Sequence, residues 1–421
     1  MIIKNFSKLG VNEVRRDALL IAEAGYEAIE INRLFQNVCS MEQKKLCIGM
    51  HEFNLDIYKK IYIIGLGKGS ARATKSILKT IPSNMLSGGV VIDIEKQWLG
   101  KIKSYKGTHP LPSNKNIAAT NEIVKLLTKA TKDDLVITII CGGGSSLICR
   151  PCNKITCTDL QAVGDHLLKS GASITEINTI RKHLSEIHGG YLAKYAYPAH
   201  VLSLIVSDVP GNKIDMIASG PTVRDTTTIA DARALGKKYG LANLDFVETP
   251  KDQKYFEHVN NIVLASGETA LYAMKTKAVE LGYSPKIYSK ALTGFAKNVG
   301  PQMAQSVTPG QALLACGETQ VHVTHPGKGG RNQDVALSAM PFLPENSAIM
   351  SCASDGKDNI PVAGGLVDDD YSVWKIEQID ANPTEAVEMN RSYITLKKIQ
   401  GIFKIRKVTA NISDFIVVLR R

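Results

Sequence analysis

IYIIGLGKGSA, residues 61–71, decides the fold of this chain, because a short apolar strand ends there in a glycine turn and a helix begins. Glycines at such a turn let the backbone approach an anion closely, and the first turn of a helix exposes unpaired N–H groups. A second glycine-rich turn, PGKGGRNQD at 326–334, opens another helix. Each turn carries one fixed cation, Lys68 or Arg331. The pattern predicts an enzyme that handles phosphoryl groups.

Around the first turn, short apolar runs alternate with helical patterns. The runs are apolar on both faces, which is typical of strands in a buried parallel sheet. The expected strands are Ile61–Ile64, Gly89–Ile92, Leu135–Ile140 and His200–Val206, and the expected helices are Ser70–Thr80, Ile117–Ala130, 158–169 and 175–196. The alternation predicts a doubly wound, Rossmann-like α/β domain over residues 1–243, which begins with a helical pattern at 11–35.

A polar stretch at 244–261, which contains Pro250, is expected to be a linker. A second α/β domain is predicted over 262–421. Its expected helices are Glu268–Leu281 and Thr293–Gln305, and its expected strands are Ile262–Ala265, Ala312–Ala315, Val321–Thr324, Ile349–Cys352 and Phe415–Leu419.

Composition narrows the class of protein. The 421 residues are 44% hydrophobic and 22% charged, as in an ordinary globular protein of two or more domains. No apolar run reaches the ~18 residues of a membrane span, and the polar N-terminus does not resemble a signal peptide, so we expect a cytoplasmic protein. The net charge of +11 is scattered. It favours a basic surface or a site for acidic small molecules over nucleic-acid binding.

The eight cysteines are expected to be free thiols, as cytosolic cysteines usually are. Cys141, Cys316 and Cys352 lie in apolar runs and are expected to be small core residues. The group Cys149, Cys152 and Cys157 is the one spacing that suggests zinc, but it lacks the second Cys or His pair of a closed zinc site.

The turn around Lys68 is similar to the start of a dinucleotide fingerprint. Its third glycine is replaced by Ser70, and no convincing acidic residue ends the next expected strand, so a nicotinamide site is disfavoured. The pattern GxxxxGK[ST] of a P-loop is absent. A tight turn alone explains the glycines. It does not explain Lys68, which we expect to contact phosphate or substrate.

CGGGSS at 141–146 follows an apolar strand, and Gly142, Gly143, Gly144, Ser145 and Ser146 are expected to cradle phosphate with backbone N–H groups. A flexible turn without a ligand is the alternative. The nucleophile-elbow pattern GxSxG fails, because Leu147 stands at its last glycine.

For three charged residues, Asp208, Asp355 and Arg181, the sequence allows both a functional and a purely structural role. Asp208 and Asp355 could hold a hydrated Mg²⁺ with substrate phosphates, or serve as turn and cap residues. Arg181, on an expected helix, could bind a carboxylate with its two-pronged guanidinium, or belong to an exposed basic face.

Taken together, these motifs resemble the glycerate 2-kinase family, whose C-terminal part is called the MOFRL domain. The matching segments run in family order: Gly67–Gly69, Thr108–Pro112, Gly142–Leu147, Glu176–Ser185, Gly189–Gly190, Ser207–Gly211, Ile217–Thr222, Gly317–Thr319, Gly329–Gln333 and Asp355–Gly356. The chain departs from the family pattern at Asn359, where a glycine is usual, and at Val408-Thr409-Ala410, where Gly-Pro-Thr is usual.

The resemblance implies two α/β domains, the second MOFRL-like from about 311, with the active site in the cleft between them. It also implies ATP, a divalent metal such as Mg²⁺, and transfer of the γ-phosphoryl group to the 2-hydroxyl of D-glycerate. The family's catalytic lysine and arginine correspond to Lys68 and Arg331. On this reading we expect Asp208, with Glu318 or Asp355, to hold Mg²⁺ or to orient the attacking hydroxyl. Arg181 and Glu318 are expected to bind the substrate.

Two other classes stay open. A hydroxypyruvate reductase dependent on NAD(P)H would share the α/β pattern and the acidic three-carbon substrate. A nucleic-acid-binding module would use the basic surplus, although aromatic residues are only 6% of the chain, too few to favour base stacking. We expect small-molecule partners, no nucleic acid and no membrane, and a homodimer is compatible with the sequence.

Overall fold

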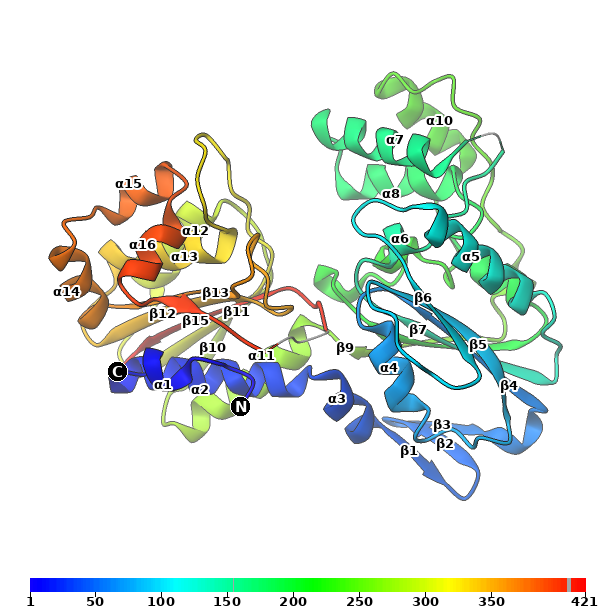
Figure 1. The fold of residues 1–421 in the computed structure, drawn as a ribbon, viewed down its shortest axis with the longest axis horizontal. Helices are drawn as coiled ribbons and strands as arrows, with labels where there is room; N and C mark the ends of the chain where they lie inside the picture. Colours follow the sequence, from blue (N-terminus) through cyan, green and yellow to red (C-terminus); the bar gives the residue numbers. More distant parts are fainter. Residues whose placement is uncertain (154, 407–409) are drawn as a thin grey trace. The chain divides into compact units, whose positions relative to one another are not determined.

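The computed structural model describes residues 1–153, 155–406 and 410–421, and it divides the chain into two compact units (Figure 1). Unit 1 combines Met1–Arg33 with Ala265–Arg421, and unit 2 is Leu34–Leu264. The family departure at Val408 and Thr409 lies outside the described residues. No helix in the described part of the chain is long and apolar enough to cross a membrane.

Unit 2 is built on a six-stranded sheet with the strand order β6-β5-β4-β7-β8-β9. Numbered along the chain, this is the order 3-2-1-4-5-6 of a dinucleotide-binding fold. The pairs from β6 to β8 are parallel. The strands are β4 (Lys60–Leu66), β5 (Leu86–Asp93), β6 (Ile102–Lys106), β7 (Asp134–Ile140), β8 (His200–Val206) and β9 (Val259–Ala265). The predicted doubly wound sheet is confirmed.

Helices cover both faces of this sheet because its strands are apolar on both faces. Tyr62, Ile64 and Leu66 of β4 share a core with α5 (Asn114–Leu127) and α9 (Tyr191–Ala196). The intervening residues of β4 face α4 (Ser70–Ile77), and a Cβ added at Gly65 would lie 3.0 Å from Oγ1 of Thr74 in that helix.

Two smaller layers complete unit 2. One is an antiparallel sheet of β1 (Cys39–Glu42), β2 (Lys45–Ile48) and β3 (His51–Asn54). The other is a helical layer with its own apolar core, made by α7 (Cys157–Lys169), α8 (Ile174–His183) and α10 (Ile229–Lys238). Helix α3 (Ile31–Val38) spans the point where the chain passes from unit 1 to unit 2. Helix α6 (Gly144–Leu147) lies in the glycine-rich turn after β7.

Unit 1 contains a second six-stranded sheet, with the order β10-β11-β15-β12-β13-β14. β10 and β11 are parallel, and the other pairs are antiparallel. The strands are β10 (Ser284–Leu292), β11 (Gln311–Gly317), β12 (Ser347–Ala353), β13 (Gly364–Asp368), β14 (Ile402–Phe403) and β15 (Asp414–Arg420). The second α/β domain is thereby confirmed as a mixed sheet.

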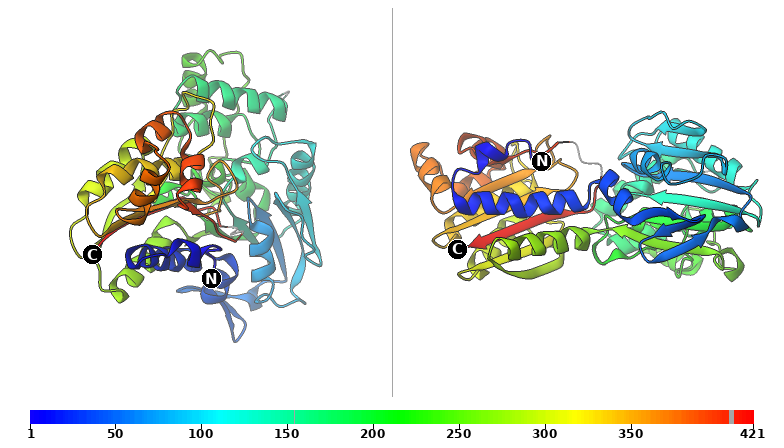
Figure 2. Two further views of the ribbon diagram at one scale, coloured as in Figure 1. Left: turned by 60° about the vertical axis from the view of Figure 1, so that its left-hand side comes forward. Right: turned by 90° about the horizontal axis from the view of Figure 1, so that it is seen from below.

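Helices again lie on both sides of this sheet. Within unit 1, α2 (Glu13–Ala28) runs beside β15 and α11 (Gly267–Glu280), as both views in Figure 2 show. The opposite face carries α12 (Ala296–Ser306) and α13 (Arg331–Ala339). The remaining helices are α1 (Phe6–Leu9), α14 (Tyr371–Gln378), α15 (Pro383–Glu388) and α16 (Ser392–Lys398).

The two compact units divide the chain at other residues than the expected ranges 1–243, 244–261 and 262–421. The N-terminal helix α2 belongs to unit 1, because its apolar stripe buries Leu19 and Ile21 in that unit. The predicted linker runs into β9, which joins the first sheet: the amide of Val201 donates to the carbonyl of His258 at 2.8 Å. A strand at Val321–Thr324 is wrong, since no strand forms there.

Candidate active site

The two glycine-rich turns of unit 2 meet where the strand order reverses, between β4 and β7. The amide of Cys141 donates to the carbonyl of Leu66 at 2.8 Å, and the amide of Lys68 donates to the carbonyl of Gly142 at 2.9 Å. Gly67 has φ +105°, and a Cβ there would lie 2.2 Å from the carbonyl oxygen of Cys141. In open α/β sheets this reversal is where ligands bind.

The side chain of Lys68 lies over the second turn. Its Cε is 3.3 Å from the position that a Cβ on Gly143 would take, and Nε2 of His109 is 3.0 Å from the same position. Burial, helped by the charge of Lys68, lowers the pKa of His109 to about 4. At neutral pH His109 is therefore uncharged, and Lys68 carries the positive charge at this point.

The turn Gly142–Ser146 has the geometry of an anion cradle. Gly143 has φ +74° and begins α6, and its amide donates to Oδ2 of Asp208 at 3.2 Å. The amides of Gly144 and Ser145 donate no hydrogen bond to any group in the described part of the chain. Backbone N–H groups presented by such a turn suit phosphate or carboxylate oxygens.

Arg181 reaches the same turn from α8, through neutral partners. Its Nη1 donates to Oδ1 of Asn178 at 3.3 Å and to Oγ of Ser219 at 3.4 Å. The Ser219 hydroxyl donates to Asn178 at 2.6 Å and lies 3.0 Å from the Ser145 hydroxyl. No carboxylate among the described residues lies within 4.0 Å of the guanidinium. Burial lowers the pKa of Arg181, so an added anion would be a favourable partner.

Backbone strain accompanies this cluster. Ala218 and Ser219 have φ +49° and +57°, the left-handed region that side chains other than glycine rarely occupy. A Cβ on Gly144 would lie 2.7 Å from the Cβ of Ala218, so the strained segment packs directly on the cradle. Strained backbone of this kind is concentrated at functional sites.

His188 is a buried histidine near Arg181 and the cradle. It is 2% exposed, and its Nδ1 lies 2.8 Å from the Ser185 hydroxyl. Burial and, to a smaller extent, the charge of Arg181 lower the pKa of His188 to about 3, although the backbone of Ser145 opposes the shift. The ring is therefore neutral, and Arg181 is the cation on this side of the turn.

The helices that follow the turns of Lys68 and Arg331, α4 and α13, each have first-turn amides that donate to an aspartate of the same unit. The amides of Gly69 and Ala71, at the start of α4, each donate to Oδ2 of Asp93 at 3.0 Å. The expectation of unpaired amides is wrong here. Asp93 is the last residue of β5. It lies one residue beyond the expected strand Gly89–Ile92, so the sequence pattern did not identify it as an acidic residue at a strand end. Because its carboxylate occupies the amides that a pyrophosphate would need, a dinucleotide would meet a like charge.

The same arrangement holds at α13 in unit 1. The amides of Asn332 and Gln333 donate to the carboxylate of Asp358 at 3.1 and 2.9 Å. A Cβ on Gly330 would lie 2.4 Å from that carboxylate, which explains the glycine. Burial raises the pKa of Asp358, although these hydrogen bonds oppose the shift.

Arg331 is held by two carboxylates. Its Nη2 donates to Oδ1 of Asp414 at 3.0 Å, and its Nη1 lies 2.6 Å from Oε1 of Glu318. Burial would lower the pKa of Arg331, but the hydrogen bond and charge of Asp414, with the charge of Glu318, raise it overall. Burial raises the pKa of Asp414 to about 6, against the opposing effect of Arg331. Arg331 is a permanent, geometrically fixed cation.

The sequence-predicted site residues therefore fall into two groups. Unit 2 brings together Lys68, the turn Gly142–Ser146, Asp208 and Arg181, whereas unit 1 brings Arg331 and Glu318 together. Asp355 lies in unit 1 and accepts the amide of Lys357 at 3.0 Å, as in a turn. Among the described residues, no group of three or more His, Cys, Asp or Glu side chains could hold a metal.

Several site residues were missed because their roles depend on tertiary contacts. Asp93 and Asp414 stand at strand ends, the one signal that the sequence offered for them. Asp358 caps a helix from a distant loop, and His188 reaches the cradle from a turn after α8, so no local pattern marks either residue.

The cysteine cluster also differs from expectation. Cys149 and Cys157 form a disulfide, while Cys152 is a buried free thiol, so the prediction of free thiols is wrong for that pair. Cys141, Cys316 and Cys352 are buried free thiols, as predicted.

Known proteins match the chain over most of its length. Residues 17–248 match the family described as "Domain of unknown function (DUF4147)", and residues 311–414 match the MOFRL family. A D-glycerate 2-kinase of Thermotoga maritima is 31% identical over 87% of this chain and 92% of its own length. A glycerate 2-kinase of Pyrococcus horikoshii is 31% identical over 97% of both chains. A protein of Agrobacterium vitis with the provisional name hydroxypyruvate reductase is 35% identical over 85% of this chain and 86% of its own length.

Solved structures agree with these matches. The crystal structure of glycerate kinase from Thermotoga maritima covers 96% of this chain and 99% of its own, with a TM-score of 0.84 and 28% identity. A crystal structure of a Pyrococcus horikoshii protein covers 97% of this chain and 99% of its own, with a TM-score of 0.82 and 29% identity. The fold and these matches thus define an α/β enzyme of the kinase class. The chain belongs to the glycerate 2-kinase family with a C-terminal MOFRL domain.

Proposed function

We propose that this enzyme transfers the γ-phosphoryl group of ATP to the 2-hydroxyl of D-glycerate and releases 2-phosphoglycerate. The observation that carries the proposal is the cluster at the strand reversal of unit 2. There a charged lysine, two open amides and an arginine without a carboxylate partner surround one turn. Such a cluster suits a small substrate with a carboxylate at one end and a phosphate arriving at the other.

Each group has a role in this reaction. Phosphoryl transfer depends chiefly on positioning and on stabilising charge at the transferring oxygens. Lys68 would neutralise that charge, and the amides of Gly144 and Ser145 would bind phosphoryl oxygens. Arg181, with Asn178 and Ser219 fixing its position, would bind the glycerate carboxylate and so orient the hydroxyl.

Arg331 would be the second cation on the transferring group. Asp414 and Glu318 hold its guanidinium in one orientation, so little reorganisation would accompany the reaction. Kinetic analysis of Lys68 and Arg331 variants tests these two roles. Glu318, rather than binding substrate, would position Arg331.

Asp208 is the residue best suited to hold Mg²⁺. Mg²⁺ takes one or two protein carboxylates and completes its shell with water and substrate phosphates. Asp208 is half-buried and adjoins the cradle through Gly143. Bound Mg²⁺ would offset the charge of the nucleotide phosphates. Asp355 is the weaker candidate, because it belongs to unit 1, whereas the cradle that would bind the phosphoryl oxygens belongs to unit 2.

The reductase named for the Agrobacterium relative is the competing candidate. It would need the dinucleotide pyrophosphate at the start of α4, where Asp93 accepts the amides of Gly69 and Ala71. The acidic three-carbon substrate would be shared by both reactions, so binding of glycerate alone does not distinguish them.

A paired activity assay tests the proposal. The purified protein is incubated with ATP, Mg²⁺ and D-glycerate, and ADP release is followed. In parallel, the oxidation of NADH or NADPH is followed with hydroxypyruvate. We expect glycerate-dependent ADP release and no nicotinamide oxidation. The reverse result would establish the reductase and refute the kinase.

A further inference from the structure

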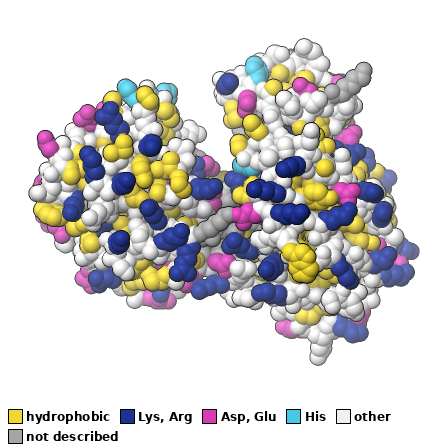
Figure 3. Space-filling model, viewed as in Figure 1, with side chains coloured by type: hydrophobic (Ala, Val, Ile, Leu, Met, Phe, Trp, Pro, Cys, Tyr) yellow, Lys and Arg dark blue, Asp and Glu magenta, His cyan; other side chains and the backbone are white. Residues whose placement is uncertain are grey.

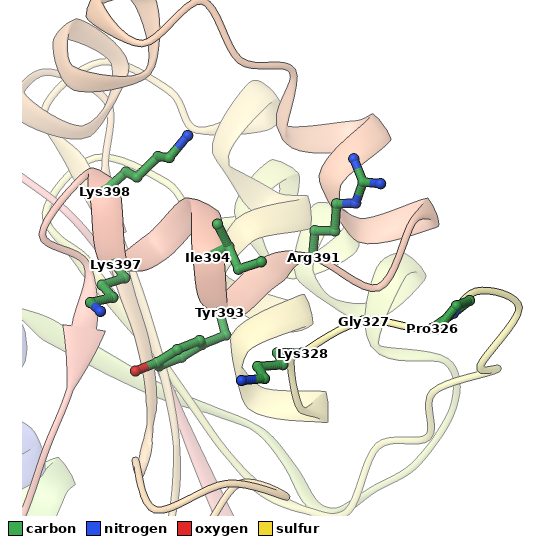
Figure 4. Close-up of a pocket in the computed structure, with 8 residues that line it drawn as sticks. All are labelled: Pro326, Gly327, Lys328, Arg391, Tyr393, Ile394, Lys397 and Lys398. Atoms are coloured by element: carbon green, nitrogen blue, oxygen red, sulfur yellow. The ribbon is translucent and has the colours of Figure 1, made fainter.

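Unit 1 contains a basic groove whose lining residues have no role in the proposed reaction. It has a volume of about 700 Å³. We define it by its lining residues, Pro326, Gly327, Lys328, Arg391, Tyr393, Ile394, Lys397 and Lys398 (Figure 4). Four of these eight residues are cations and none is acidic. The surface in the view of Figure 3 mixes basic, acidic and apolar side chains.

The cations of the groove lack acidic partners. Among the described residues, no carboxylate forms an ion pair with Lys328, Arg391, Lys397 or Lys398, although many exposed lysines of this chain do, such as Lys290 with Glu268. In Figure 4 the ring of Tyr393 lies between the ammonium groups of Lys328 and Lys397, and all three side chains extend to one side. Arg391 and Lys398 extend away from this ring in Figure 4. Two uncompensated cations on either side of an aromatic ring are suited to a polyanion that also has a flat, weakly polar part.

The groove is joined to the turn that carries Arg331. The amide of Tyr393 donates to the carbonyl of Lys328 at 3.1 Å, which fixes α16 against the turn. A Cβ on Gly327 would lie 2.0 Å from the carbonyl oxygen of Asn390, so the backbones are in close contact. Lys328 and Arg331 are three positions apart, so their Cα atoms are at most about 11 Å apart.

We propose that this groove binds the nucleoside triphosphate, with the phosphate chain along Lys328 and Lys397 and the base against Tyr393. The γ-phosphoryl group would then leave the groove along the turn toward Arg331. The Cα separation of at most about 11 Å between Lys328 and Arg331 keeps both residues on one short turn. This inference rests on the proposed kinase function, which it deepens by giving the nucleotide a binding surface in unit 1.

Calorimetric titration with ATP tests the groove without turnover. The double variant Lys328→Ala/Lys397→Ala should weaken ATP binding about 10- to 100-fold, since each loses a charge-assisted contact. Tyr393→Leu should weaken ATP binding but leave tripolyphosphate binding unchanged. The control Lys286→Ala/Lys297→Ala removes the same charge from exposed positions outside the groove of the same unit, and it should bind ATP like the wild type.

Steady-state kinetics separate this inference from the kinase proposal. The groove variant should raise KM for ATP and leave KM for D-glycerate within about twofold, in line with a contact to nucleotide alone. An active kinase whose groove variant keeps wild-type ATP affinity would overturn the groove while the kinase stands. The groove proposal would also be overturned if the groove variant and the control variant lost the same ATP affinity, or if the wild-type protein bound inorganic phosphate as tightly as ATP. Groove-dependent ATP binding without glycerate phosphorylation would refute only the kinase proposal.

Discussion

Replacing Arg181 should separate substrate binding from stability. Its guanidinium has only the neutral partners Asn178 and Ser219, at 3.3 and 3.4 Å, and burial lowers its pKa. Its charge therefore adds little to the unliganded fold. A carboxylate that accepts two charge-assisted hydrogen bonds from it would gain about 3–6 kcal/mol. Partial solvent exposure reduces this to about 3–4 kcal/mol, which corresponds to roughly 10²–10³-fold in affinity.

We therefore expect Arg181→Met to raise KM for D-glycerate roughly 10²–10³-fold and to unfold at the wild-type temperature or above it. The matched control is Arg150→Met, because Arg150 lies in the same unit but is paired with Glu186 at 3.1 Å. The control should keep its KM within about threefold. Kinetics and thermal unfolding without ligand provide both readouts. A folded Arg181→Met enzyme with wild-type KM, or one that is destabilised as strongly as a core variant, would refute the reasoning.

The remaining predictions concern the lysine, the second arginine, pH and the disulfide. Lys68→Ala should lower kcat roughly 10²–10³-fold in a folded protein, and near-normal kcat would remove Lys68 from catalysis. Arg331→Lys should lower kcat more than it changes ATP affinity. It should also lower the free energy of unfolding by about 1–3 kcal/mol, because an ammonium cannot keep both hydrogen bonds of the guanidinium with Asp414. If the variant retains most of its kcat, Arg331 has a structural role only. The folded pKa of His188, about 3, lies below the unfolded value of ~6.5, so the unfolded state binds more protons between these values. Between pH 6.5 and 5, wild type should therefore lose about 1.6 kcal/mol more unfolding free energy than His188→Asn, and parallel losses in the two proteins would contradict this. The Cys149→Ser/Cys157→Ser variant should keep most of kcat, since neither thiol belongs to the cluster around the turn; zinc that copurifies stoichiometrically and is lost together with activity would argue against it.

The first sheet was the easier part to predict. Its strands are apolar on both faces and separated by helices, so period and length identified β4, β7 and β8 directly. The helix expected over 175–196 was less complete, because Gly189 and Gly190 adopt φ +57° and +92° and separate α8 from α9. Local periodicity predicts that a helix or strand is present. Where the element ends depends on single residues, such as these glycines.

The division into units could not be predicted, because it depends on which elements pack together. The amphipathic pattern of α2 indicates a buried stripe and says nothing of its partner, which is α11, far away in the chain. The candidate site shows the same limit. Glycine turns indicated Lys68 and Arg331, but no local pattern connects these turns to the strand ends that supply their carboxylates. Asp93 accepts the amide of Gly69, and Asp414 accepts from the guanidinium of Arg331.

The most direct test of the central claim is the identity of the phosphorylated product. The wild-type enzyme is incubated with ATP, Mg²⁺ and D-glycerate, and the product is identified by phosphorus NMR against authentic 2- and 3-phosphoglycerate, with the Lys68→Ala enzyme as the control. The account predicts 2-phosphoglycerate from the wild type and a rate at least about 10²-fold lower from the variant. Only 3-phosphoglycerate, or no turnover with the metal present, would contradict it.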